Sequence, residues 1–153
     1  MKNKVCEALK LDNQLCFALY SASLAMGKYY KPLLEKLGLT YPQYLMMLVL
    51  WEQDGITSTE LGKRLQQELG ALSPVIKRLE SQGLIERLRN PKDDRKVQLF
   101  LTEQGRTLQQ RAESVPHTTL CASGLNTEQA MALKEQLDAL RQSMAGYRAP
   151  ARE

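Results

Sequence analysis

Residues 57–101 read TSTELGKRLQQELGALSPVIKRLESQGLIERLRNPKDDRKVQLFL, and this stretch decides the fold. Thr57 and Glu60 have the spacing of a capping box, which predicts a short helix at the start of the stretch. After a break around residues 68–70, a second helix follows and ends at Gly83. The apolar residues of this second helix share one face: Leu72, Val75, Ile76 and Leu79. Two short helices joined by a tight turn are typical of a helix-turn-helix.

The hydrophobic period changes from 3.6 to 2 after Gly83. Residues 84–89 and 96–101 both alternate as strands do, and the polar run 90–95 between them predicts a turn. A helix, a turn, a second helix and a charged β-hairpin in this order predict a winged helix over about residues 40–101.

The residues upstream of the helix-turn-helix predict two more helices. Residues 12–37 carry an apolar stripe with helical spacing, and Pro32 should kink or break that helix. Residues 40–51 begin with a capping box at Thr40 and are apolar on every side. We expect this second helix to be the buried centre of the fold.

The residues downstream of the hairpin predict helices as well. A long helix should run over residues 102–121, with a kink at Pro116. Gly124 breaks it, and Asn126 or Thr127 caps a last helix. The leucine spacing of this last helix is that of a coiled-coil seam: Leu133, Leu137, Leu140 and Met144.

A length of 153 residues allows one compact core, so we expect a single domain over residues 1–153. The predicted fold class is mainly α with a small β-hairpin wing. The winged helix-turn-helix is flanked by terminal helices over residues 10–37 and 103–145. Such helices suit a twofold homodimer, although they could instead pack only within their own chain.

Positive charge is concentrated in the winged helix. Nine lysines and arginines and five acidic residues lie between Lys63 and Lys96, a balance of +4 that equals the net charge of the whole chain. This pattern favours double-stranded DNA as the partner, because a short helix fits the major groove while lysine and arginine neutralise phosphates. The alternative is an ordinary solvated face. The expected DNA-binding residues lie on the second helix and the wing: Ser73, Pro74, Lys77, Arg78, Asp93, Arg95 and Lys96.

The rest of the composition excludes several classes of protein. No apolar run approaches the roughly 20 residues that span a bilayer, and residues 1–14 lack the apolar core of a signal peptide. We therefore expect a cytoplasmic protein without a membrane partner. A single histidine and the lack of CxxC spacing predict no metal site and no cofactor.

Three cysteines, Cys6, Cys16 and Cys121, are an odd number for a disulfide framework. One interpretation is that they are small buried hydrophobic residues. Cys6 has no evident role.

The order of elements resembles the MarR family of transcriptional regulators over essentially the whole chain. Residues 90–97 (NPKDDRKV) match the wing motif of that family, and residues 79–85 (LESQGLI) match the end of its reading helix. The resemblance implies that Arg95 enters the minor groove and that Asp93 helps to hold it.

One branch of that family, the organic hydroperoxide resistance regulators, is matched more closely. Residues 11–20 (LDNQLCFALY), 30–34 (YKPLL) and 39–44 (LTYPQY) carry this resemblance. The chain departs from the branch at Leu69 and Ala71, where small hydroxyl residues are usual, and only Ser73 keeps a hydroxyl. The operator sequence or the affinity for it should therefore differ.

The resemblance implies roles for two cysteines and three tyrosines. Cys16 is expected to be the peroxide-reactive thiol, and Cys121 to form a disulfide with the reactive cysteine of the other subunit. Tyr30 and Tyr41 are expected to hydrogen-bond the thiolate across the dimer, with Tyr20 nearby.

These expectations describe a repressor of a pseudo-palindromic operator that organic hydroperoxide releases by oxidising Cys16. An alternative within the same fold is a repressor relieved by a small aromatic or lipophilic ligand, with Cys16 buried and not redox-active. A rival from another class is a thiol peroxidase, for which the basic helix-turn-helix would be unexplained. We therefore expect a regulator and not an enzyme.

Overall fold

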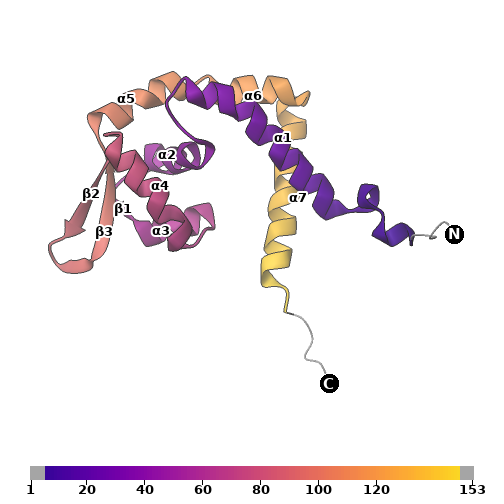
Figure 1. Cartoon of the computed structure of the whole chain (residues 1–153), viewed down its shortest axis with the longest axis horizontal. Helices are drawn as coiled ribbons and strands as arrows, with labels where there is room; N and C mark the ends of the chain where they lie inside the picture. Colours follow the sequence, from indigo (N-terminus) through magenta and orange to yellow (C-terminus); the bar gives the residue numbers. More distant parts are fainter. Residues whose placement is uncertain (1–5, 149–153) are drawn as a thin grey trace. The chain divides into compact units, whose positions relative to one another are not determined.

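The computed structural model describes residues 6–148, and of Asp94 and Arg95 it describes the backbone alone. The chain divides into two compact units, residues 1–113 and 114–153. A single domain over residues 1–153 stays a prediction. The fold is mainly helical with one small antiparallel sheet, as the sequence predicts (Figure 1).

The first unit begins with two short 3-10 turns, η1 (Glu7–Leu9) and η2 (Leu11–Asn13), which the sequence analysis did not foresee. Helix α1 (Leu15–Glu35) follows and continues through Pro32. Of the kink or break expected at this proline, the break is therefore wrong. Buried Leu34 anchors the last turn of α1, and its carbonyl accepts the backbone N–H groups of Leu37 and Leu39. These contacts hold the helix end in place although Pro32 donates no hydrogen bond.

Helix α2 (Tyr41–Glu52) forms the buried centre, as expected. The Thr40 side chain accepts from the backbone N–H of Gln43, and the Gln43 side chain accepts from the backbone N–H of Thr40, which completes a capping box. Six residues of α2 are buried: Gln43, Tyr44, Met46, Met47, Val49 and Leu50.

The helix-turn-helix consists of α3 (Ser58–Leu65) and α4 (Leu69–Ser81). The predicted capping box of Thr57 and Glu60 is present at the start of α3. Helix α4 begins earlier than the sequence analysis expected. The backbone of Glu68 is extended and its carbonyl accepts from the Ala71 N–H, so the interruption ends at Glu68 and the helix begins at Leu69.

The wing is the hairpin of β2 (Ile85–Asn90) and β3 (Asp93–Leu101), which Figure 1 shows beside α3 and α4. Asn90 pairs with Asp93, so the turn is shorter than the predicted run 90–95. A further strand, β1 (Ile56–Thr57), pairs with β3 and gives the order β1-β3-β2. Two residues are too few to show a period of two in a sequence.

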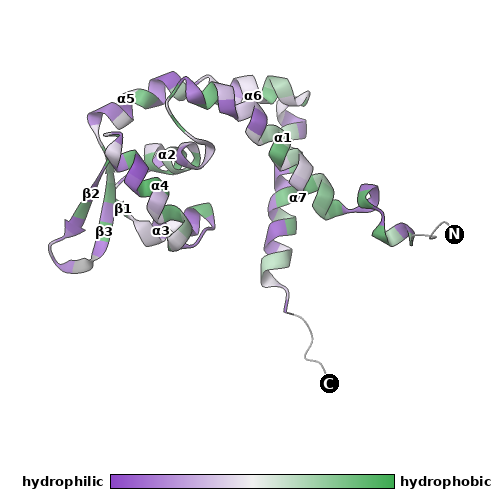
Figure 2. Ribbon diagram, in the orientation of Figure 1, coloured by the Kyte–Doolittle hydropathy of each residue, from purple (hydrophilic) through white to green (hydrophobic). Residues whose placement is uncertain are grey.

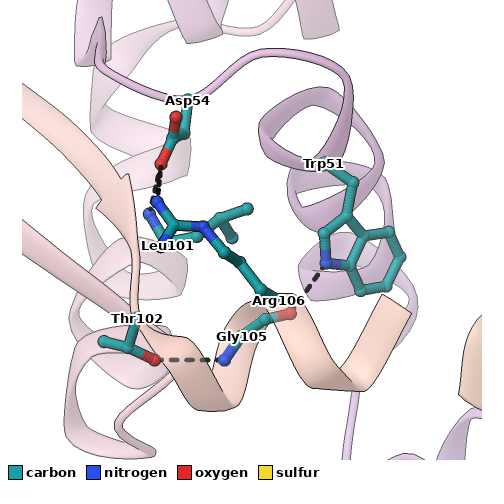
Figure 3. A network of polar contacts seen from close by, with 6 residues as sticks. All are labelled: Trp51, Asp54, Leu101, Thr102, Gly105 and Arg106. Carbon is teal, nitrogen blue, oxygen red and sulfur yellow. Dashed lines mark hydrogen bonds and ion pairs between the residues drawn. The ribbon is translucent and has the colours of Figure 1, made fainter. Parts of the chain in front are cut away.

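Helix α5 (Glu103–Ala112) is fastened to α2 and the sheet by polar contacts that Figure 3 shows. The Trp51 indole N–H donates to the Gly105 carbonyl at 2.9 Å, and the Thr102 hydroxyl accepts from the Gly105 N–H at 3.1 Å. The Asp54 carboxylate accepts from the Leu101 N–H at 3.0 Å and from Arg106 at 3.4 Å. These contacts therefore fix the positions of α5 and the end of β3 relative to α2.

The second unit contains α6 (Val115–Ser123) and α7 (Thr127–Gly146). The predicted single helix over residues 102–121 is wrong, because α5 ends at Ala112 and α6 starts at Val115. Pro116 lies in the first turn of α6, where no N–H is needed, so it begins a helix and does not kink one. Gly124 at φ 73° ends α6, and Asn126 caps α7 as expected.

Within the part of the chain that the structure describes, no helix combines the length and the apolar character needed to cross a membrane.

Candidate functional site

The outward face of α4 carries the side chains that the sequence predicts for DNA contact. Leu72, Ile76 and Leu79 are buried and fix the rotation of the helix. That rotation leaves four of the predicted residues exposed: Ser73, Pro74, Lys77 and Arg78.

Ser73 and Pro74 are the fifth and sixth residues of α4, and not its first, because the helix starts at Leu69. The Ser73 hydroxyl donates to the Leu69 carbonyl at 3.0 Å. Its proton is therefore used within the helix, which leaves its lone pairs for an external donor. Leu69, half-exposed, is the first residue of α4, so an apolar side chain and not Ser73 stands at the start of this helix.

Two arginines of this region are already paired. Arg87 on β2 forms a bidentate ion pair with Glu80 on α4, at 2.8 and 3.0 Å, and this hydrogen bonding lowers the pKa of the Glu80 carboxyl. Arg64 is paired with Glu52. Six other basic residues make no ion pair with any residue whose side chain the structure describes: Lys63, Lys77, Arg78, Arg89, Lys92 and Lys96.

The wing presents its basic residues near a tight turn. The Asn90 side chain accepts from the Lys92 N–H at 3.0 Å and fixes the turn. Asp93 is half-buried and opens β3, while Lys96 is exposed. Arg95 lies in β3, and its side chain, on which the expected minor-groove contact depends, lies outside the described residues.

All three cysteines are exposed and none is in a disulfide. The interpretation of these residues as small buried hydrophobes is therefore wrong for this chain. Cys16 is the second residue of α1, and Tyr20 lies one helical turn further on with 65% of its side chain exposed.

Tyr30 is the centre of an aromatic cluster at the other end of α1. Its ring centroid lies 5.1 Å from that of Tyr41 and 5.7 Å from that of Tyr44, and Tyr29 makes an edge contact at 6.4 Å. Burial, followed by the neighbouring Tyr30, raises the pKa of Tyr41. Burial, followed by the neighbouring Tyr30 and Tyr41, raises the pKa of Tyr44 to about 12. Both phenols therefore stay protonated near neutral pH and can donate hydrogen bonds.

Cys16 and the aromatic cluster do not meet within one chain. Helix α1 is continuous from Leu15 to Glu35, and Tyr30 lies fourteen positions after Cys16. At a rise of about 1.5 Å per residue these two positions are about 21 Å apart. The structure thus brings Tyr30 and Tyr41 together, while Cys16 has only Tyr20 on its own turn.

A polar chain joins the aromatic cluster to the end of α4. The buried Gln43 donates from Nε2 to the Gln82 Oε1 at 2.9 Å, and Gln82 donates to the Gly38 carbonyl at 3.0 Å. Gln43 also caps the turn that carries Tyr41. The sequence analysis missed Tyr44 and Gln82. The spacing of Tyr41 and Tyr44, one helical turn apart, could have revealed Tyr44, but nothing in the sequence pairs Gln43 with Gln82.

Helices α1 and α7 both expose large apolar side chains, and Figure 2 shows hydrophobic residues recurring along each of them. On α1 the exposed residues are Leu15, Phe17, Tyr20, Leu24 and Met26. On α7 they are Met131, Leu133, Leu137 and Met144, three of which belong to the predicted seam.

Cys121 lies on α6 of the second unit, one turn after His117. The Cys121 Sγ and the His117 Nδ1 are 3.9 Å apart. The sequence analysis missed this contact, although the i, i+4 spacing on a helix could have indicated it.

Known proteins with similar sequences and folds are transcriptional regulators. Residues 28–112 match the family of transcriptional regulators SarA/Rot. The organic hydroperoxide resistance transcriptional regulator of Bacillus subtilis is 45% identical over 144 residues, covering 94% of this chain and 97% of that protein.

Two solved structures are similar over most of their length. Reduced AbfR of Staphylococcus epidermidis bound to DNA is 30% identical with a TM-score of 0.72, covering 93% of this chain and all of the other. Disulfide-formed AbfR is 32% identical with a TM-score of 0.60, covering 88% and 94% of the two chains.

Proposed function

This chain belongs to the MarR-like winged-helix transcriptional regulators, and from that premise we propose that it is a DNA-binding repressor that senses organic hydroperoxides through Cys16. The observation that carries the proposal is the unbroken helix α1. It separates the Cys16 thiol from Tyr30 by about 21 Å, so only two chains together can build the sensor.

The DNA contact uses the exposed face of α4 and the wing. Ser73, Pro74, Lys77 and Arg78 enter the major groove, where Ser73 can accept a hydrogen bond and the two cations reach base edges or phosphates. Lys96 and the wing residues Asp93 and Arg95 follow the adjacent backbone and minor groove. In a twofold dimer, the two winged helices bind a pseudo-palindromic operator whose half-sites are ~34–36 Å apart.

The homodimer is formed by the exposed apolar faces of α1 and α7. Large side chains such as Leu24 and Leu137, each at least 40% exposed in the single chain, gain hydrophobic free energy when a second copy covers them. If the two α1 helices run antiparallel, Cys16 of one subunit meets Tyr30 and Tyr41 of the partner subunit. The dimer is then required for sensing as well as for reading two half-sites.

At this junction the phenols donate hydrogen bonds to the Cys16 sulfur and favour its thiolate, which is the form that attacks peroxides. Tyr20, one turn from Cys16 and exposed, completes the surroundings.

The redox step is stoichiometric and the chain is not an enzyme. The Cys16 thiolate attacks the terminal oxygen of the hydroperoxide, the O–O bond breaks, and Cys16 becomes a sulfenic acid. The alkoxide that leaves takes a proton from water and becomes an alcohol. The thiol of Cys121 from the other subunit then displaces the hydroxyl as water, giving an intersubunit disulfide. Forming this bond requires Cα atoms within roughly 4.4–6.8 Å, and the proposed mechanism has the helices move to reach this distance.

That movement changes the separation of the winged helices of the two subunits and releases the operator. Losing the DNA contacts of one winged helix costs several kcal/mol, which is enough for strong derepression. The structure of disulfide-formed AbfR, which has a similar fold, supports the idea that this architecture accommodates a disulfide.

The test is a gel shift with the DNA upstream of the chain's own gene, with and without cumene hydroperoxide. Cys16→Ser should bind DNA as tightly as the parent chain and stay bound after peroxide, while the matched control Cys6→Ser should release DNA as the parent does. If Cys16→Ser still releases DNA on oxidation, Cys16 is not the sensor.

A further inference from the structure

His117 is the one histidine of the chain, and it lies beside one of the two proposed redox cysteines. Its Nδ1 is 3.9 Å from the Cys121 Sγ, within the reach of a hydrogen bond to sulfur. Both side chains are exposed, and they share one face of α6 because four residues separate them.

No other titratable side chain of α6 competes for this contact. The helix reads VPHTTLCAS, in which His117 and Cys121 are the only groups that titrate. The hydroxyls of Thr118 and Thr119 donate to the carbonyls of Ser114 and Val115, one turn back. Within the described part of α6, His117 is therefore the only base within one turn of the Cys121 sulfur.

We propose that His117 is a catalytic residue for disulfide formation and acts as the base that takes the Cys121 proton. This inference rests on the proposed function, which makes Cys121 the thiol that resolves the sulfenic acid. Histidine exchanges protons near neutral pH, and a ring nitrogen without a hydrogen accepts from a thiol. To act as this base, His117 takes the tautomer that carries its hydrogen on Nε2, so that the free Nδ1 faces Cys121.

Cys121 gives its proton to His117 Nδ1 while its sulfur attacks the sulfur of the Cys16 sulfenic acid. The S–S bond forms, the S–O bond breaks, and the hydroxide that leaves takes the proton from His117 to become water. Cys121 sulfur is oxidised and Cys16 sulfur is reduced, so no further oxidant is needed beyond the organic hydroperoxide that formed the sulfenic acid.

The first arm of the test measures the two redox steps separately in a Cys6→Ser background. After a pulse of cumene hydroperoxide, dimedone traps the sulfenic acid of Cys16, and nonreducing electrophoresis follows the disulfide. In His117→Gln the sulfenic acid should form at the parental rate, while the disulfide should form at least about tenfold more slowly. This minimum is set conservatively, since a positioned base usually contributes about 10²- to 10⁴-fold to a rate. Ala122→Gln, at an exposed neighbouring position, is the matched control and should leave both rates unchanged.

A second arm does not depend on the sensing mechanism. In a Cys6→Ser, Cys16→Ser background, iodoacetamide should alkylate Cys121 several-fold faster when His117 is intact than in the His117→Gln variant, and circular dichroism checks that both chains are folded. Equal alkylation rates, or disulfide rates within twofold of each other, would overturn the role of His117. If no chain gives a dimedone adduct at Cys16, the proposed function fails, and the alkylation rates still decide whether His117 activates Cys121.

Discussion

Gly105 shows how one residue fastens the wing to the centre of the fold. A Cβ at this position would lie 2.1 Å from the Leu84 carbonyl oxygen. The Gly105 carbonyl accepts a hydrogen bond from the Trp51 indole N–H. Backbone therefore approaches backbone where α5 crosses the start of β2, and only glycine leaves the necessary space.

Gly105→Ala should lower the free energy of unfolding by about 1–3 kcal/mol, because the added methyl group has to displace backbone atoms. Gly146→Ala is the control, since nothing lies within 4 Å of a Cβ placed there. Urea unfolding of both variants measures the difference. Equal stability of the two variants would show that the close approach at Gly105 is relaxed at no cost.

Tyr44 gives the fold a dependence on alkaline pH. Burial, together with Tyr30 and Tyr41, raises the pKa of Tyr44 from 10.0 to about 12. A raised pKa means that the unfolded chain releases this proton first, so stability is complete below pH 10 and falls between pH 10 and 12. The fall should amount to about 2–3 kcal/mol, since each pKa unit corresponds to about 1.4 kcal/mol.

Comparing the unfolding free energies of the parent and Tyr44→Phe from pH 9 to 12 isolates this contribution from other titrations. Between pH 10 and 12, the free energy of unfolding of the parent should fall by about 2–3 kcal/mol relative to that of Tyr44→Phe. A difference that stays constant would contradict the assignment.

At the scale of elements, capping signals were predictable and helix lengths were less so. Thr40 with Gln43, Thr57 with Glu60 and the cap at Asn126 all begin helices where the sequence predicts. These motifs are local, since a side chain and a backbone N–H three residues apart form them without help from the rest of the fold.

Prolines and short strands were not predictable, because tertiary contacts decide them. Pro32 stays inside α1 since Leu34 is anchored in the core, whereas Pro116 marks the start of a separate helix. Strand β1 exists only through its pairing with β3. For the candidate site, the sequence indicated the exposed face of α4 and the pair Tyr30 and Tyr41, but the link from Gln43 to Gln82 depends on contacts between residues far apart in the chain.

Helix α4 carries the element-level prediction for DNA binding. Lys77→Ala should weaken binding to operator and unrelated DNA by similar factors and reduce the slope of log affinity against log salt by about 1, because one phosphate contact is lost. Lys134→Ala on α7, where Lys134 is paired with Asp138, changes the charge equally and should leave the slope unaltered. Fluorescence anisotropy over a range of salt concentrations gives both slopes, and equal slopes would place the contact elsewhere.

At the scale of the whole molecule, the exposed apolar faces call for a second copy of the chain. Leu137→Glu puts a charge into the α7 seam, where burial without a partner costs several kcal/mol, so the dimer should dissociate. Sedimentation velocity should then show the mass of one chain and DNA affinity should fall. Glu135→Lys, a charge change on the opposite face of α7, serves as the comparison, and a Leu137→Glu chain that remains dimeric would exclude α7 from the interface.

We propose that each sensor is built from Cys16 of one chain and the phenols of the other, and mixed dimers test this arrangement most directly. One chain carries Cys16→Ser and the other carries Tyr30→Phe with Tyr41→Phe, and both carry Cys6→Ser and Cys121→Ser so that dimedone reports Cys16 alone. In the mixed dimer the only Cys16 faces intact tyrosines of the other chain, so it should react with cumene hydroperoxide at the rate of the chain with all tyrosines. A rate equal to that of the homodimer with both tyrosines replaced would contradict the claim.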